Sequence, residues 1–139
     1  MPGFIARADI EVDASPERVW ETLTRYASDV NFGAVVESDW KTGSSVVWRG
    51  EWEGKAFEDE GVVLEAIAPL RLVLTHSSGG STAGAASGTV HRLSYELSGR
   101  GAGTHLEFWQ DGNATPSAAG EAERNWRTHL AAVKERAER

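Results

Sequence analysis

Apolar and polar residues alternate along the first segment of the chain. Four apolar side chains would face one side of an extended strand and three charged ones the other: Ala6, Ala8, Ile10 and Val12 against Arg7, Asp9 and Glu11. This period of two predicts a half-buried strand. Ser15-Pro16-Glu17 then offers a cap, a first-turn proline and a first-turn acid for a short helix. A second short helical turn is predicted before Gly33.

From residue 34 to residue 110 the pattern predicts strands. We expect a weak strand over 35–40 and further strands over 46–53, 57–67, 70–76, 91–97 and 104–110. Gly61 within the third of these predicts a bulge or bend. Leu70, Leu72, Leu74 and His76 would share one face. The Gly-, Ser- and Ala-rich stretch 77–88 is of low complexity and predicts a mobile loop.

The last segment predicts one long helix over 117–137. Thr115 is a candidate cap and Pro116 a candidate first helical residue. Spacings of three and four place one stripe of residues on a single face: Ala119, Ala122, Trp126, Leu130, Val133 and Ala137. The small residues at its start either let the helix approach a sheet closely or leave room for another molecule.

The order of elements predicts an α+β fold in one domain over residues 1–139. Two short helices would follow the first strand. One long helix cannot cover a wide flat sheet. We therefore expect a curved antiparallel sheet of six to seven strands wrapped around the C-terminal helix.

Composition excludes several classes of function. The chain has 139 residues, no cysteine and a formal net charge of −7. Disulfides, thiolate metal sites and a cysteine nucleophile are therefore excluded, and a nucleic-acid backbone would be repelled. We expect no signal peptide and no membrane span, and a cytoplasmic location. Four histidines occur without metal-ligand spacing, so no metal and no cofactor are expected.

Several segments resemble one known superfamily over nearly the whole chain. They are residues 12–20 (Val-Asp-Ala-Ser-Pro-Glu-Arg-Val-Trp), 38–44, 48–55, 58–65, Gln110-Asp111-Gly112-Asn113 and Asn125-Trp126. The chain resembles the START/polyketide-cyclase-like superfamily, also called SRPBCC, in its activator of heat-shock-protein-90 ATPase homologue-like branch. The resemblance implies the helix-grip fold and a cavity between sheet and helix that holds lipids, hormones, polyketides or other apolar ligands. Some members are cyclases or dehydratases. The loop after His76 departs from the branch pattern.

The inward phase of the strands and the helix predicts the lining of such a cavity. The expected ligand-binding residues are Trp48, Trp52, Leu74, His76, His91, Tyr95, Phe108, Gln110, Trp126 and Leu130. Tryptophans converging from several elements would form an aromatic wall, or would simply belong to the core.

Two polar groups have alternative interpretations. His76 and His91 either act on a ligand as acid, base or orienting groups, or cap the rim of the sheet by bonding to loop backbone. The run Glu58-Asp59-Glu60 either places a carboxylate in the cavity or forms a solvated edge paired with Arg49 or Lys55.

Three functions remain open, and we order them by the residues that support each. The first is binding of a small hydrophobic molecule, lipid- or polyketide-like, without catalysis. The second is a cyclase- or dehydratase-type enzyme acting on an apolar substrate, for which no catalytic residues can be assigned. The third is a co-chaperone-like protein-interaction module. Ligand identity and oligomeric state stay open at this point.

Overall fold

A computed structural model describes residues 3–78 and 90–139 of the chain. Most of the predicted loop over 77–88 lies outside the described residues. In chain order the elements are β1 (Phe4–Val12), α1 (Pro16–Leu23), the 3-10 helix η1 (Ala27–Asp29), β2 (Val35–Glu37), β3 (Ser45–Trp52), β4 (Lys55–Ile67), β5 (Arg71–Ser78), β6 (Val90–Arg100), β7 (Gly103–Asn113) and α2 (Pro116–Ala137).

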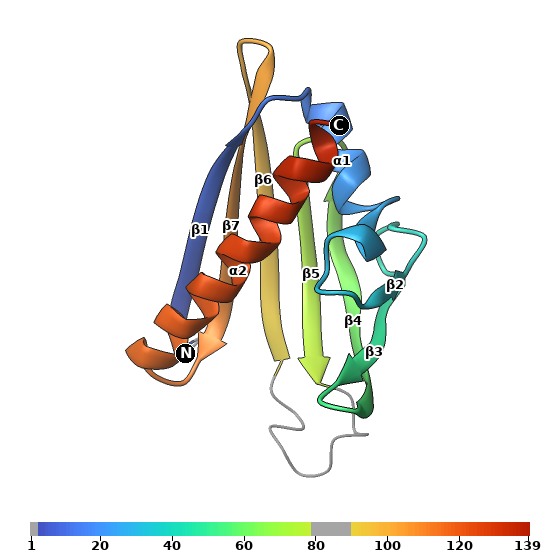
Figure 1. Ribbon diagram of the computed structural model, residues 1–139, viewed down its shortest axis with the longest axis vertical. Helices are drawn as coiled ribbons and strands as arrows, with labels where there is room; N and C mark the ends of the chain where they lie inside the picture. The colour runs from blue at the N-terminus through green and yellow to red at the C-terminus, as the bar shows by residue number, and fades with distance from the viewer. Residues whose placement is uncertain (1–2, 79–89) are drawn as a thin grey trace.

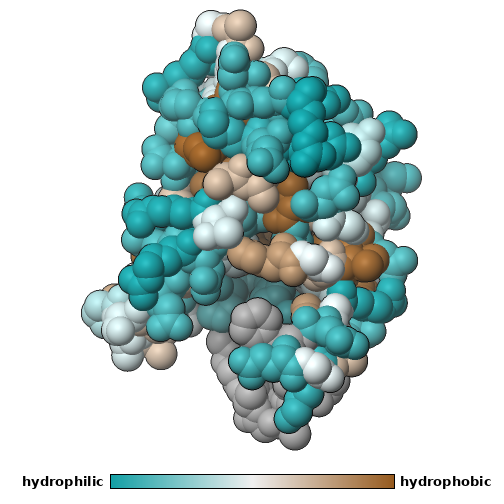
Figure 2. All heavy atoms as spheres, in the orientation of Figure 1, coloured by the Kyte–Doolittle hydropathy of each residue, from teal (hydrophilic) through white to brown (hydrophobic). Residues whose placement is uncertain are grey.

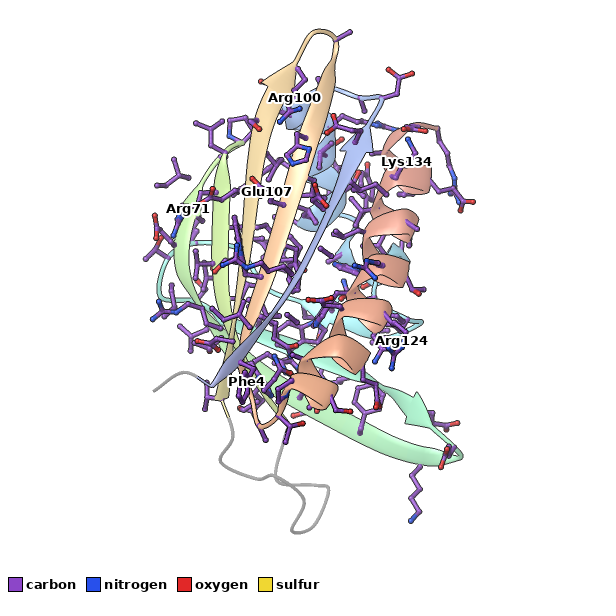
Figure 3. The ribbon with its side chains drawn as sticks, turned by 90° about the vertical axis from the view of Figure 1, so that its left-hand side faces the viewer. Phe4, Arg71, Arg100, Glu107, Arg124 and Lys134 are labelled. Atoms are coloured by element: carbon purple, nitrogen blue, oxygen red, sulfur yellow. The ribbon has the colours of Figure 1, made fainter. Side chains whose placement is uncertain are left out.

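Seven strands form one antiparallel sheet in the order β1-β7-β6-β5-β4-β3-β2. Each strand from β2 to β6 pairs with the next along the chain, and β1 forms the far edge against β7. In Figure 1, α2 crosses one face of this sheet diagonally and its C-terminal end reaches α1. Figure 3 shows β3 and β4 curving beneath the helix. The predicted α+β helix-grip fold, with its curved sheet and two short helices after the first strand, is confirmed.

Local sequence signals determine where both α-helices begin. The Ser15 side chain accepts a hydrogen bond from the Arg18 backbone N–H, and Pro16 occupies the first turn. The Thr115 side chain accepts from the Ala118 N–H at 3.0 Å. These caps satisfy amide groups that have no partner within the helix. Both predicted helix starts are confirmed, with α2 beginning at Pro116.

The core lies between the concave face of the sheet and the two α-helices. Its fully buried large side chains include Phe108, Leu72, Leu93, Leu106 and Leu130. Figure 3 shows side chains filling the space between sheet and α2. Burial of apolar area of this kind is the main stabilising contribution to the fold.

Three expectations need correction. The weak strand over 35–40 is only three residues long, Val35–Glu37. Leu70 does not share the inner face with Leu72, because it precedes β5 in a turn and is 51% exposed. The sequence predicts a bulge or bend at Gly61, whereas the irregularity in pairing with β5 falls later, between Val63 and Glu65.

Gly61 is required for a different reason. A Cβ atom at this position would lie 1.8 Å from the Thr75 carbonyl oxygen on β5. No side chain fits at that distance, so β4 and β5 approach each other here only because residue 61 is glycine.

Candidate functional site

A cavity of about 320 Å³ opens between the N-terminal half of α2, the concave face of the sheet and the segment that follows η1. Figure 2 shows this face of the molecule hollowed beside α2. The cavity is lined by Asn31, Phe32, Ala34, Trp48, Glu51, Phe57, Asp59, His76, Leu93, Gln110, Asn113, Ala122, Asn125 and Trp126. Its volume lies at the lower end of the range for small-molecule sites, roughly 300–1,000 Å³.

Side chains from neighbouring strands of the sheet line the cavity. Trp48 on β3 stands directly opposite Asp59 on β4, and Leu93 on β6 stands opposite Gln110 on β7. Directly opposed residues of an antiparallel pair lie on the same face. Asp59 pairs with Ser78 on β5. His76 lies two residues before Ser78 on the same strand, and its ring contacts the Asp59 carboxylate. Alternation along five strands thus brings these side chains to one concave surface.

His76 and Asp59 form a hydrogen-bonded pair in the wall of the cavity. The distance from His76 Nε2 to Asp59 Oδ2 is 3.0 Å. The Trp48 ring packs edge-on against the imidazole at a centroid distance of 4.9 Å. Burial lowers the pKa of His76, an effect that the charge and hydrogen bond of Asp59 partly oppose. The imidazole is therefore neutral near pH 7, and its Nε2–H donates to the carboxylate.

The second ring nitrogen of His76 is buried. Nδ1 has no hydrogen-bond partner among the residues that the structure describes. With the proton on Nε2, Nδ1 carries only a lone pair. It has almost no accessible surface, so solvent in the open part of the cavity does not reach it.

Trp126 and Gln110 form the opposite wall. The Trp126 indole Nε1–H donates to the Gln110 side-chain oxygen at 3.0 Å. The indole ring also packs on Phe108, with ring centroids 4.4 Å apart. Asn113 donates to the backbone carbonyls of Phe4 and Gln110, which ties the ends of β1 and β7 together. These contacts hold the half-buried indole over the cavity.

His91 takes a different role from His76, although the two are directly opposed across β5 and β6. Its Nδ1–H donates to the Asp111 carbonyl oxygen at 2.7 Å. The backbone at Gly112 passes so close that a Cβ atom there would lie 3.0 Å from His91 Nδ1. Of the two interpretations above, this geometry matches hydrogen bonding to backbone at the rim of the sheet.

The acidic run divides between the two faces of β4. Asp59 points into the cavity, whereas Glu58 accepts a hydrogen bond from Arg49 at 3.1 Å on the outer face. Arg49 is shared with Glu37 of β2. Both interpretations of the run therefore hold, each for a different residue.

The other expected site residues are not among the described residues that line the cavity. Leu74, Tyr95, Phe108 and Leu130 are buried in the core. Trp52 ends β3, and its side chain lies outside what the structure describes. Trp20 and Trp40 line a separate groove at the other end of β2, so the tryptophans do not form one wall.

Sequence reasoning missed two parts of the lining. The segment Asn31-Phe32-Gly33-Ala34 has no periodicity that would have pointed to it. Phe57 did have a signal, because it shares the phase of Asp59 and Val63 along β4. Its ring covers Gly50 of β3, where a Cβ atom would lie 3.0 Å from the phenyl carbons.

A buried polar chain beneath the cavity was also missed. The Tyr95 hydroxyl donates to His129 Nε2 at 2.9 Å, and His129 Nδ1–H donates to the Val30 carbonyl at 2.6 Å. Burial lowers the pKa of His129 to about 4 and raises that of Tyr95. Both groups therefore stay neutral at pH 7. The chain anchors the segment that carries Asn31 and Phe32 to α2.

Fold and cavity together define the class of protein, which is the helix-grip, polyketide-cyclase-like fold of the SRPBCC superfamily. The family model described as "Activator of Hsp90 ATPase homolog 1-like protein" matches residues 13–138, and the chain belongs to this family. No curated protein matches the chain. None of the helices within residues 3–78 and 90–139 is long and apolar enough to cross a membrane.

Solved structures share the fold. ChR145 from Cytophaga hutchinsonii is 34% identical, with a TM-score of 0.82 over 97% of this chain and 94% of that one. CV1439 from Chromobacterium violaceum is 21% identical, with a TM-score of 0.77 over 100% and 99%. DynU16, a protein of the dynemicin biosynthetic locus, is 18% identical with a TM-score of 0.76. The match covers 96% of this chain but 47% of DynU16.

Proposed function

We propose that the protein binds a small, mostly apolar molecule in the cavity between the sheet and α2 without transforming it. The observation that supports this most is the lining itself. Aromatic rings from three elements, those of Trp48, Phe57 and Trp126, line the cavity together with polar side chains that include Asp59, His76 and Gln110. This combination is typical of small-molecule sites. The resemblance to the SRPBCC superfamily, which implies a cavity for apolar ligands, supports the same proposal.

The orientation of His76 supports binding over catalysis. In a catalytic histidine, a carboxylate holds one ring nitrogen and the other faces the substrate. Here Asp59 holds Nε2, and the nitrogen left over, Nδ1, is buried away from the open space. The lining within the described residues also contains no serine or threonine that could serve as a nucleophile. We therefore propose that the pair orients a ligand.

Filling the cavity from α2 tests this proposal. Ala122 lines the cavity, whereas Ala131 lies on the exposed face of the same helix. N-phenyl-1-naphthylamine, a neutral fluorescent probe, should bind saturably to the parent protein. Ala122→Trp should weaken binding at least tenfold, and the matched control Ala131→Trp should not. Thermal unfolding of both variants establishes that they are folded.

Two results would contradict the proposal. One is the absence of saturable probe binding to the parent. The other is equal probe binding by a folded Ala122→Trp variant, since the probe would then occupy another surface. Mass spectrometry of the protein under native conditions complements the titration by detecting a molecule retained through purification.

A further inference from the structure

The charges around the cavity are of one sign. Among the described residues that line it, Asp59 and Glu51 are acidic and none is lysine or arginine. Residues 79–89, which join β5 to β6, contain no charged residue in the sequence. A ligand in this cavity therefore meets two carboxylates and, among the described lining residues, no lysine or arginine.

Arginines adjacent in sequence to lining residues are directed elsewhere; Arg92, beside Leu93, and Arg127, beside Trp126, are exposed. Arg49 follows Trp48 on β3 but bonds to Glu37 and Glu58 on the outer face. Arg124 precedes the lining residue Asn125 on α2, yet it is exposed and points away from the sheet (Figure 3). Neither cation is placed to neutralise an anion inside the cavity.

Asp59 can be reached from the cavity. Its side chain is 19% exposed and that of His76 is 24% exposed. The neighbouring imidazole adds no positive charge near pH 7, because burial lowers the pKa of His76. A carboxylate in a partly desolvated wall attracts a cation more strongly than one in water.

Aromatic rings beside Asp59 also favour a cationic group. Trp48 stands directly opposite Asp59 across β3 and β4, and Phe57 shares the face of Asp59 on β4. The faces of such rings attract cations, tryptophan most strongly. The rings also provide the apolar surface for the rest of a ligand.

We infer that the cavity selects an apolar, ring-containing molecule that carries a protonated amine, with the ammonium group at Asp59 and the apolar body against Trp48, Phe57 and Trp126. This inference rests on the proposed function and narrows its ligand class. The same charges disfavour fatty acids and other anionic ligands.

Three naphthalenes that differ in one substituent test the inference at pH 7.5. They are 2-naphthalenemethylamine, which is cationic, 2-naphthalenemethanol, which is neutral, and 2-naphthoic acid, which is anionic. The amine should bind about tenfold more tightly than the alcohol, the gain typical of one hydrogen bond to a charged group. The acid should bind most weakly. Calorimetric titration gives the three dissociation constants.

Two isosteric variants locate the effect. Asp59→Asn should bring the dissociation constants of amine and alcohol within about threefold of each other, because the amide keeps an acceptor for His76 but loses the charge. Glu58→Gln removes the neighbouring carboxylate on the outer face and should keep the tenfold preference.

The possible outcomes distinguish a failure of this inference from a failure of the proposed function. If the alcohol binds and the amine binds no more tightly, the inference is wrong while the proposed function stands. A preference for the amine that persists in folded Asp59→Asn also overturns the inference. If neither the naphthalenes nor N-phenyl-1-naphthylamine bind, the proposed function fails and the inference fails with it.

Discussion

The Tyr95 hydroxyl donates a hydrogen bond to His129 Nε2 at 2.9 Å, and both side chains are buried between the sheet and α2. The other nitrogen of His129 is committed to the Val30 carbonyl. Donor and acceptor roles along this chain are therefore fixed, and the imidazole is held in one neutral tautomer. Removing any member leaves a buried polar group without its partner.

Tyr95→Phe should destabilise the protein by about 1–3 kcal/mol, because it leaves His129 Nε2 unsatisfied in the core. Urea unfolding of mutant and parent measures the difference. Tyr26→Phe is the matched control, since phenylalanine retains the ring that stacks with Arg136. The control should change stability by less than about 0.5 kcal/mol. Equal stabilities of all three proteins would show that the hydrogen bond contributes nothing.

Stability should fall as the pH drops from about 6.5 towards 4. The pKa of His129 is lowered to about 4 in the folded protein, from 6.5 in the unfolded chain. Between these values the unfolded chain binds a proton that the folded protein does not, so acid favours unfolding. The full loss is roughly 3 kcal/mol. The lowered pKa of His76 acts in the same direction.

Two measurements check the role of His129 in this pH dependence. Denaturant unfolding across pH 4–7 should give a flatter curve for His129→Gln than for the parent. In the parent, NMR signals of the His129 ring should keep their neutral positions down to about pH 5. A ring that titrates near pH 6.5 would contradict the buried, neutral assignment.

Gly61→Ala should destabilise the protein by about 3 kcal/mol or more, because its Cβ would overlap the Thr75 carbonyl and force β4 and β5 apart. Gly120→Ala in α2 is the contrasting change. Nothing lies within 4 Å of a Cβ at that position. Alanine there should stabilise the helix by about 0.5–1 kcal/mol. Thermal unfolding distinguishes the two, and a neutral Gly61→Ala would mean that the strands are farther apart than described.

The fold could be predicted because its signals are local and repeated. Alternation over six or more residues defines most strands, and the caps at Ser15 and Thr115 define the helix starts. Each signal depends on the residue's own neighbours in sequence. The family resemblance independently implied the same fold.

The site was harder to predict because it depends on packing between distant segments. Alternation correctly placed Trp48, His76 and Gln110 on the concave face, but it could not distinguish a cavity wall from the filled core that contains Tyr95 and Leu130. Filled and open parts of the same face differ only in what α2 brings opposite them.

The orientation of α2 about its axis gives a second reason why the site was harder to predict than the fold. The sequence pattern centres the stripe on Trp126 and Leu130, because large apolar residues are expected to face the sheet. The structure buries His129 fully and leaves Trp126 half-exposed at the cavity. A histidine can occupy the core only because Tyr95 and Val30 satisfy both of its nitrogens. Those partners lie 34 and 99 residues away, beyond any local pattern.

The central claim is that a small molecule occupies the cavity beside α2, and the tryptophan indole N–H signals in a nitrogen-15 NMR spectrum test it most directly. On titration with 2-naphthalenemethylamine, the signals of Trp48 and Trp126 should shift and saturate together, because both residues line the cavity. Those of Trp20, Trp40 and Trp109 should stay in place. Unchanged Trp48 and Trp126 signals, or shifts confined to Trp20 and Trp40, would contradict the account.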